Sequence, residues 1–338
     1  MTALLLEWTI KIAVLLGVLM TAVAYLTLLE RKFMSWIQLR VGPDRVGYWG
    51  LLQPVADGIK MIFKEDIIPL EANRAVYLAA PAIALIAALM SMIVIPYGSQ
   101  VNVFGRVIDL HVTRMNVGVL YVLALTSLGV YGFVLAGWAS NNKYSLLGGL
   151  RSSAQMISYE LAFGLSMVSV LLYTGTLDLA SIAEGQSGWY GLKWNIVQFP
   201  LMFVFVVFYI AALAETNRTP FDLPEADSEL VAGYHTEYSS MKFVMFQVAE
   251  YLNLITSSSI ATTLFLGGWN GPFVDRFPLL GLVYFGVKVL ALILLAMWIR
   301  YTVPRFRYDQ LMRFGWKVLL PIAIINIVIT ATILLLRS

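Results

Sequence analysis

The sequence contains no cysteine and only two histidines, His111 and His235. Without thiolates the chain can form no disulfide and can hold no cysteine-ligated iron–sulfur cluster or zinc ion. A helical bundle with two bis-histidine haems needs four histidine ligands, so that class of cytochrome is excluded as well. We therefore expect the chain itself to hold no metal, haem, flavin or iron–sulfur cluster.

Charged residues are also scarce. They make up 13% of the 338 residues, whereas about 25% is usual in soluble proteins. A charge in the middle of a membrane costs roughly 2.5–3.5 kcal/mol on insertion scales, so segments that face lipid avoid it. The hydrophobic content of 59% and the mean hydropathy of +0.78 agree with this explanation. The net charge of +3 is ordinary for a membrane protein with basic loops and gives no reason to expect a nucleic-acid partner.

Eight apolar stretches are long enough to cross a hydrocarbon core of roughly 30 Å, which takes about 20 helical residues. Because lipid offers the backbone no hydrogen-bonding partner, each stretch is expected to be an α-helix. The first one has no basic leader and is too long for a signal peptide, so we expect it to stay as an anchor. The chain is thus predicted to be an all-α, polytopic membrane protein with one domain over residues 1–338. The predicted spans are 6–29, 74–97, 116–138, 155–176, 195–216, 242–267, 279–300 and 316–336.

The basic residues predict how the chain is oriented. Seven Lys or Arg lie in the first loop, 30–74, and further ones in the loops 139–154 and 300–315. Because cytoplasmic loops are enriched in Lys and Arg, we expect the first, third, fifth and seventh loops to be cytoplasmic and both termini to face the other side. We favour a bacterial plasma (inner) membrane over the inner membrane of an organelle.

The first loop contains a segment, 51–64, that is too short and too polar to span. Its apolar and polar residues both recur at helical spacing, and Pro54 suits a first helical turn. We expect an amphipathic helix that lies in the membrane interface. Its apolar face would be Leu52, Val55, Ile59, Ile62 and Phe63, and its polar face Gln53, Asp57, Lys60 and Lys64.

Three carboxylates lie within or at the ends of predicted spans: Glu160, Glu215 and Glu250. Such groups are costly in lipid unless they face water or the protein interior, and burial raises a carboxyl pKa toward the range where protons exchange. A single acid at a helix end, such as Glu215, can equally well reach the membrane surface. Together with the loop acids described next, the three favour a proton relay.

The fifth loop, 217–241, is acidic although it is counted among the cytoplasmic loops. We interpret it as an ordered loop that lines a polar cavity, because prolines and apolar residues alternate with the acids. A solvated acidic loop is the alternative, and a proton-exchange role for His235 stays open. The acids are Asp222, Glu225, Asp227, Glu229 and Glu237, against the single basic residue Arg218.

The basic residues of the first loop have two possible interpretations, and one lysine lies within a predicted span. Arg31, Arg40 and Lys60, beside Asp57, can be plain membrane anchors, or they can mark the entrance of a cavity for an amphipathic ligand. Lys288, in the middle of the seventh span, is expected to point into the bundle and to meet a carboxylate there.

Several long segments of the sequence resemble the complex I subunit 1 family, a membrane component of proton-translocating NADH:quinone oxidoreductase. The resemblance covers nearly the whole chain, and its motifs are long and specific. They are ERKFMSWIQLRVGPDRVGYWGLLQPVADGIKMIFKED, AQMISYELAFG, LAETNRTPFDLPEADSELVAGYHTEYS, FQVAEY and IRYTVPRFRYDQLMRFGWK, in this order.

The resemblance implies a place and a role for the chain. Ubiquinone or menaquinone, as the substrate, would enter from the bilayer between the first span, the amphipathic helix and the sixth span. The expected partners are the other complex I subunits: peripheral-arm subunits with the terminal iron–sulfur cluster and the quinone head-group site, and antiporter-like and small membrane subunits. Residues 305–309 would dock the hydrophilic arm. The family's quinone chamber maps onto Arg31, Arg40, Asp57, Lys60, Arg218 and Phe221, and its proton path onto Glu160, Glu215, Glu225, Asp227, Glu229 and Glu250.

One position departs from the family pattern. Many members carry glutamate where this chain has Asp227. The charge is kept, but the side chain is one methylene shorter, so a proton transfer there would need a bridging water.

Two other functions fit parts of the pattern. A homologous subunit of a membrane-bound hydrogenase would have a different soluble partner and could lack quinone. A stand-alone ion-coupled transporter would also use carboxylates in the middle of the membrane. The charged motif PRFRYDQLM, however, is typical of a surface that docks a soluble partner.

Overall fold

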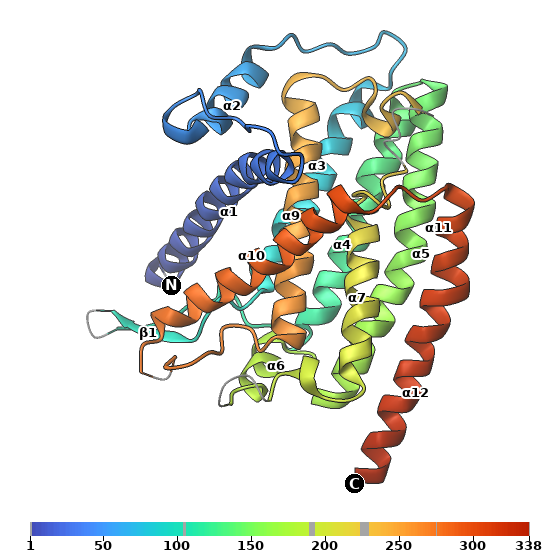
Figure 1. Cartoon of the computed structure of the whole chain (residues 1–338). Helices are drawn as coiled ribbons and strands as arrows, with labels where there is room; N and C mark the ends of the chain where they lie inside the picture. Colours follow the sequence, from blue (N-terminus) through green and yellow to red (C-terminus); the bar gives the residue numbers. More distant parts are fainter. Residues whose placement is uncertain (1, 104–105, 189–192, 224–229, 275, 338) are drawn as a thin grey trace.

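The computed structural model describes residues 2–103, 106–188, 193–223, 230–274 and 276–337. Within these ranges the chain is almost entirely helical, which confirms the predicted all-α class (Figure 1). Its long helices are α1 (Thr2–Ile37), α3 (Arg74–Ser91), α4 (Gly118–Ala139), α5 (Lys143–Thr174), α7 (Leu201–Glu215), α9 (Ser240–Phe265), α10 (Leu279–Thr302) and α12 (Leu320–Arg337). The shorter ones are α2 (Gln53–Phe63), α6 (Leu179–Gly185) and α11 (Tyr308–Phe314).

The eight long helices correspond to the eight predicted spans. Six helical stretches in the described part of the chain are long and apolar enough to cross a membrane, and α7 is apolar but shorter, with 15 residues. The 26-residue α9 is long enough to cross a membrane, but it is less apolar than the other spans, and its second half is rich in serine and threonine. Those six stretches are Glu7–Ile37, Arg74–Val94, Gly118–Ala139, Lys143–Thr174, Leu279–Thr302 and Tyr308–Arg337.

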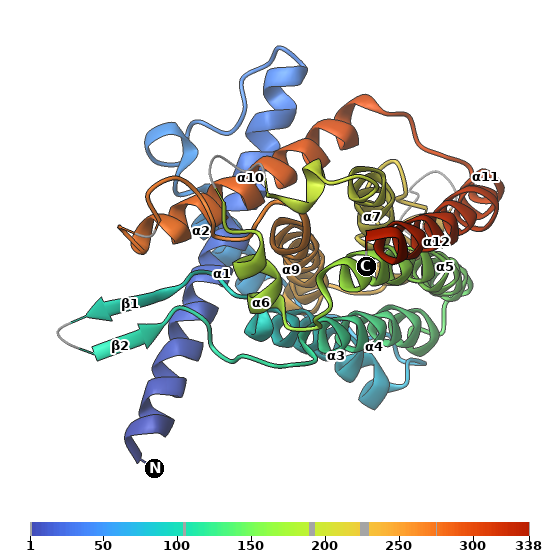
Figure 2. The same cartoon turned by 90° about the horizontal axis from the view of Figure 1, so that it is seen from below.

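The composition of α9 follows from its position. Seen along the bundle, α9 lies near the centre, surrounded by α3, α4, α5, α7 and α10 (Figure 2). From Leu254 to Phe265 almost all of its side chains are buried. Hydroxyl groups are therefore tolerated there because they face other helices and bond to carbonyls one turn back, as Thr262 and Thr263 do at 2.8 and 2.9 Å.

The predicted amphipathic helix is present as α2. It lies beside one end of the bundle, which we call the α2 end; α6 lies at the opposite end (Figure 1). None of its residues is buried, and Val55, Ile59 and Ile62 each expose more than half of their surface. An apolar face left open in this way fits a helix that rests on lipid or on another chain.

A short β-hairpin was not predicted. Strands β1 (Gln100–Val103) and β2 (Arg106–Asp109) pair antiparallel, with Val101 opposite Ile108, between α3 and α4. The hairpin projects from the bundle away from α2 (Figure 1). Its residues lie in what the hydropathy pattern marks only as a loop, and a four-residue strand is too short to stand out by alternation.

Small residues allow the central helices to approach closely. A Cβ atom added at Gly132 of α4 would lie 2.8 Å from the Cβ of Ala84 in α3, and one at Gly137 would lie 3.1 Å from the Cα of Gly149 in α5. Because apolar side chains gain little by leaving lipid, such backbone contacts are a main source of association between membrane helices. They hold α3, α4 and α5 together as one layer.

Gly148 of α5 allows the second half of the acidic loop, at Tyr234, to lie close to the bundle. A Cβ atom there would lie 2.6 Å from the backbone nitrogen of Tyr234, so we expect Gly148→Ala to displace this segment and to destabilise the protein by about 1–3 kcal/mol. Thermal denaturation of the purified complex measures this. Gly164→Ala in the same helix is the matched control, since nothing lies within 4 Å of its added Cβ. Equal stability of the two variants would contradict the prediction.

Candidate functional site

Two of the predicted carboxylates lie close together inside the bundle. Glu215 is the last residue of α7 and is 9% exposed, and the partly buried Glu160 of α5 lies close enough to interact with it electrostatically. Two consecutive residues of α4 contact the two carboxylates. Ser127 donates a hydrogen bond to Glu160 Oε1, and the Thr126 hydroxyl lies beside the Glu215 carboxyl. Sequence reasoning missed Thr126 and Ser127, because hydroxyl residues in a membrane span are too common to be a signal on their own.

The third carboxylate, Glu250 of α9, is held by a residue from the second half of the acidic loop. The Tyr234 hydroxyl donates a 2.6 Å hydrogen bond to Glu250 Oε1. Tyr234 is fully buried and its ring lies edge-on to Phe133 and Phe246, with centroids 5.0 and 5.4 Å apart. Its position is therefore fixed by packing, and it ties the protonation state of Glu250 to the placement of the loop.

A buried ionic cluster that sequence reasoning missed centres on Glu30, near the end of α1. Arg218 Nη1 donates to Glu30 Oε2 at 3.1 Å, and Arg300 of α10 donates to Oε1. The hydroxyls of Tyr251 and Tyr301 add bonds of 2.6 and 3.1 Å to the same carboxylate. Glu30 is 4% exposed, so these four donors take the place of water around its buried carboxylate.

The Glu30 cluster holds the segment that follows α7. Arg218, predicted for the quinone chamber, is buried and also lies 4.2 Å from the centre of the Tyr251 ring. A few residues on, Phe221 is buried between Tyr159 and Phe306, with centroids 5.7 and 5.6 Å away. The segment leaving Glu215 is therefore ordered at least as far as Phe221 and packs against residues of α1, α5 and α9 and of the loop after α10.

The basic segment after α10 contacts the same loop. Arg305 Nη2 lies 3.0 Å from Asp222 Oδ2, and the backbone amide of Phe306 donates to the carbonyl of Pro220 at 3.2 Å. The Gln155 amide of α5 holds the loop from the other side, with bonds of 2.8 Å to the carbonyl of Ala214 and 2.7 Å to that of Phe221. Residues near 305 thus brace the acidic loop within this chain.

The other predicted chamber residues lie around α2. Arg31 Nη1 and Asp57 Oδ2 are 2.6 Å apart and join α1 to α2. Arg40 is exposed and bonds to Gln38, and Lys60 is exposed on α2. These four residues form a group at the surface, separate from the buried pair Arg218 and Phe221.

The far end of α2 is attached to the start of α9. Lys242 Nζ lies 2.7 Å from Asp66 Oδ1, and Ser240 donates to the carbonyl of Met61 at 2.9 Å. With the Arg31–Asp57 pair, these contacts hold α2 between α1 and α9. The remaining acids predicted for the proton path, Glu225, Asp227 and Glu229, lie outside the described residues.

The prediction for Lys288 was wrong. Instead of a carboxylate, its ammonium meets three backbone carbonyls just beyond the end of α9: Leu266 at 2.7 Å, Gly268 at 2.9 Å and Asn270 at 2.7 Å. It also lies 4.3 Å from the centre of the Trp194 ring. Terminal carbonyls lack helical partners and carry partial negative charge, so they can replace a carboxylate as the acceptor.

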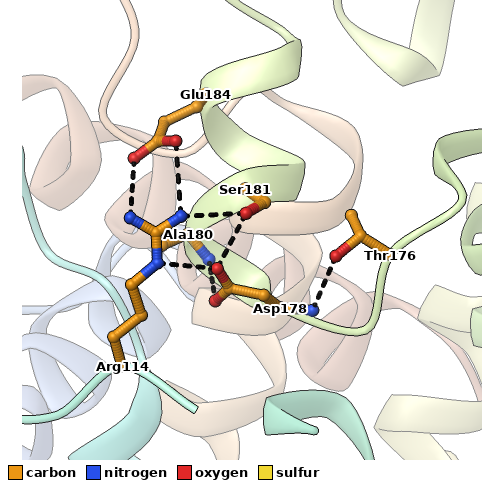
Figure 3. A network of polar contacts seen from close by, with 6 residues as sticks. All are labelled: Arg114, Thr176, Asp178, Ala180, Ser181 and Glu184. Carbon is orange, nitrogen blue, oxygen red and sulfur yellow. Dashed lines mark hydrogen bonds and ion pairs between the residues drawn. The ribbon is translucent and has the colours of Figure 1, made fainter. Parts of the chain in front are cut away.

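A second polar network lies at the α6 end and joins the loop before α4 to α6 (Figure 3). Arg114 Nε donates to Asp178 Oδ2 at 2.8 Å, and its Nη2 donates to Ser181 at 2.9 Å and faces Glu184 at 3.5 Å. Burial alone would raise the pKa of Asp178, but hydrogen bonds from Ser181, Arg114 and the Ala180 amide together hold it below its ordinary value. The network consists of satisfied pairs, which is typical of a structural clasp.

In the part of the chain that the structure describes, no group of three or more His, Cys, Asp or Glu side chains is placed to hold a metal ion. The carboxylates of the interior are instead surrounded by hydroxyl, amide and guanidinium groups. These polar partners stabilise charged side chains inside the bundle.

The fold and the site together define a polytopic membrane protein with ionisable residues buried in its helical bundle. The family model described as "NADH dehydrogenase" matches residues 10–331. The H subunit of the NADH-quinone oxidoreductase of Protochlamydia amoebophila is 55% identical and covers 92% of this chain and 92% of its own length. H subunits of the same enzyme from Geobacter sulfurreducens and Cytophaga hutchinsonii are 51% and 47% identical and cover 97% and 98% of this chain and 95% and 98% of their own lengths. The chain therefore belongs to the complex I subunit 1 family, as a membrane-embedded component of NADH-quinone oxidoreductase.

Proposed function

We propose that this chain forms the quinone entry chamber of its complex and starts the acidic path that couples quinone reduction to proton translocation. The observation that carries the proposal is the pair formed by the buried Glu215 and the partly buried Glu160, which lies at the base of the segment that carries Arg218 and Phe221. A change of charge near Arg218 can reach Glu215 through three residues of continuous, ordered backbone.

Quinone would approach past α2, between α1 and α9. The Arg31–Asp57 pair and the Lys242–Asp66 pair hold α2 over this approach, and its open apolar face suits contact with lipid and with an isoprenoid tail. Arg40 and Lys60 lie on the same side and would attract or orient the polar head group. Loops 1, 3, 5 and 7 would face the cytoplasm of a bacterial cell.

Reduction of quinone takes up protons and changes the charge near the Glu30 cluster. Arg218 would then redistribute its interaction between Glu30 and the ligand, and the segment up to Asp222 would move with it. A small shift of the segment would change the electrostatic interaction between Glu215 and Glu160, and with it the path of the proton. Glu250, held by Tyr234, would accept the next proton, and Glu225, Asp227 and Glu229 would supply the path from the loop.

The contacts of the 305–309 segment favour a docking role for the chain's basic loop. Arg305 and Phe306 hold the acidic loop, so a peripheral subunit bound there would affect Asp222 and Pro220 directly. The antiporter-like membrane subunits would receive the proton signal on the side of α4 and α5. A hydrogenase-type complex would share the carboxylates, and the identity of the soluble partner in the purified complex distinguishes the two.

Glu215→Gln in the assembled oxidoreductase tests the proposal. The amide has the size of the carboxyl but cannot exchange a proton, so we expect NADH:quinone reductase turnover and proton pumping in proteoliposomes both to fall about tenfold, with Glu215→Asp retaining part of each. The control is Glu7→Gln, an exposed residue paired with Lys11 on the surface of α1. Wild-type turnover and pumping in Glu215→Gln, at normal assembly, would refute the relay.

A further inference from the structure

A small enclosed cavity lies beside Glu215, between α4, α5, α7 and α9. Its volume open to a water molecule is about 10 Å³. Most of the lining surface is carbon, but the residues that form it include Thr126, Glu215, Asn253, Thr256 and Ser257, each of which carries a hydrogen-bonding group. A cavity that is about one water molecule in size can hold an ordered water where two or more such groups reach into it.

One oxygen of Glu215 needs such a partner. Its Oε2 atom is buried and accepts no hydrogen bond from any described residue. A buried carboxyl oxygen without a partner costs about 1–3 kcal/mol, more if it is charged. The cavity beside it offers the space from which a partner can reach this atom.

The other groups are suited to bind the same water. Thr126 and Ser257 donate their hydroxyl hydrogens to carbonyls of their own helices, at 2.9 Å to Leu123 and 3.2 Å to Leu254. Their oxygen lone pairs are thus left to accept hydrogen bonds, while the Asn253 amide can donate one. A water with Asn253 as donor and Glu215 with a hydroxyl as acceptors would have three bonds, the usual number for a buried water.

We propose that this cavity binds one water molecule which relays the proton of Glu215 toward α9, and that Thr126 and Asn253 are its positioning residues. This inference rests on the proton relay proposed above. The Glu215 carboxyl gives its proton to the water while the water releases one of its own toward the Glu250 carboxylate of α9, which becomes a carboxylic acid as Glu215 becomes a carboxylate, so no hydronium ion persists and no electrons move. The direction is set by α9, on which Glu250, Asn253 and Ser257 recur at i, i+3 and i+7 and therefore share one face.

The direct test is a high-resolution map of the whole complex. We expect density for a water about 2.8 Å from Glu215 Oε2 and within hydrogen-bond reach of Thr126 or Ser257. Because this measurement uses the unaltered protein, it does not depend on whether a variant assembles. A map at a resolution that shows other buried waters but none in this cavity would overturn the inference.

A matched pair of variants tests the function of the water. Thr126→Val keeps the shape and removes the acceptor, so we expect proton pumping to fall about threefold to tenfold, the effect of one hydrogen bond. Thr126→Ser restores the hydroxyl and should pump normally. An infrared O–H band of a buried water, identified by its shift in oxygen-18 water, should be present in the unaltered complex and in Thr126→Ser and lost in Thr126→Val; a direct contact of Thr126 with Glu215, without a water, would give no such band.

The outcomes separate this inference from the proposed function. If Glu215→Gln loses pumping but Thr126→Val retains pumping, and the unaltered complex shows no water band that depends on Thr126, the relay stands and the water site is refuted. If Glu215→Gln pumps normally, the relay itself is refuted, and this inference with it, even where density shows a water.

Discussion

Replacing Glu30 by glutamine is expected to destabilise the protein by about 3–5 kcal/mol, because it leaves the buried Arg218 and the partly exposed Arg300 without their shared counter-ion. Arg218 is 6% exposed and lies too deep to find water, and Arg300 bonds to the same carboxylate. The amide keeps the volume of the side chain, so the loss isolates the effect of the charge. Blue-native electrophoresis would show less assembled complex, and the complex that remains would lose quinone reductase activity at a lower temperature.

The control for this change lies on the same helix. Glu7→Gln removes a carboxylate whose pair with Lys11 is largely exposed, so it should cost less than about 1 kcal/mol. Glu30→Asp keeps the charge but shortens its reach, and it should fall between the two. A Glu30→Gln complex as stable and as abundant as Glu7→Gln would show that the cluster is not a structural centre of the site.

The long helices could be predicted because the bilayer leaves few choices. An apolar stretch of about 20 residues has to be helical in lipid, so α1, α3, α4, α5, α10 and α12 follow from hydropathy alone. The amphipathic α2 follows from its two faces. The exact start of α7 could not be predicted from the sequence. We expected a span from residue 195, but the helix begins at Leu201, after Pro200, and a 3₁₀ turn precedes it.

The polar contacts inside the bundle could be predicted only in part. The sequence marks Glu160, Glu215 and Glu250 as unusual, since each is a charge near an apolar stretch. It does not mark the partners, because Glu30 is 188 residues from Arg218 and 270 from Arg300. Such pairs depend on how helices cross, and a one-residue rotation of either helix would remove them.

Glu30 itself was missed for a local reason. It directly precedes Arg31 and Lys32, and in that context it looks like part of the charged boundary of the first span. In the structure α1 continues to Ile37, so Glu30 lies well before the helix ends and faces the bundle. The extension of α1 beyond the apolar stretch is what turns a boundary residue into a buried one.

The end of α9 shows how the chain satisfies backbone groups without water. The chain turns there through Gly267 and Gly268, both at positive φ, and leaves several carbonyls without helical partners. The Gln186 amide donates to the carbonyls of Thr263 and Leu264 at 2.9 and 3.3 Å, and Asn195 donates to that of Leu264 at 2.7 Å. Lys288 donates to the carbonyls of Leu266, Gly268 and Asn270, to which these two amides do not bond.

Replacing Lys288 by methionine is therefore expected to loosen this end of α9. Methionine keeps the unbranched stem but removes an ammonium that bonds to three carbonyls, and each unsatisfied buried group costs about 1–3 kcal/mol. Relaxation and partial hydration will recover part of this, so we expect a net loss of about 3 kcal/mol. Hydrogen–deuterium exchange of the purified complex should show faster exchange at residues 262–270.

Two further variants show which property of Lys288 matters. Lys11→Met removes a lysine whose partner, Glu7, is on the surface, and it should leave exchange at 262–270 unchanged. Lys288→Arg keeps the charge, but a planar guanidinium cannot point three donors at carbonyls grouped around one atom, so protection should be only partly restored. Residues 262–270 could prove as well protected from hydrogen exchange in Lys288→Met as in Lys11→Met. The three carbonyls would then have to be satisfied without the ammonium, and the turn after α9 would be held by Gln186 and Asn195 alone.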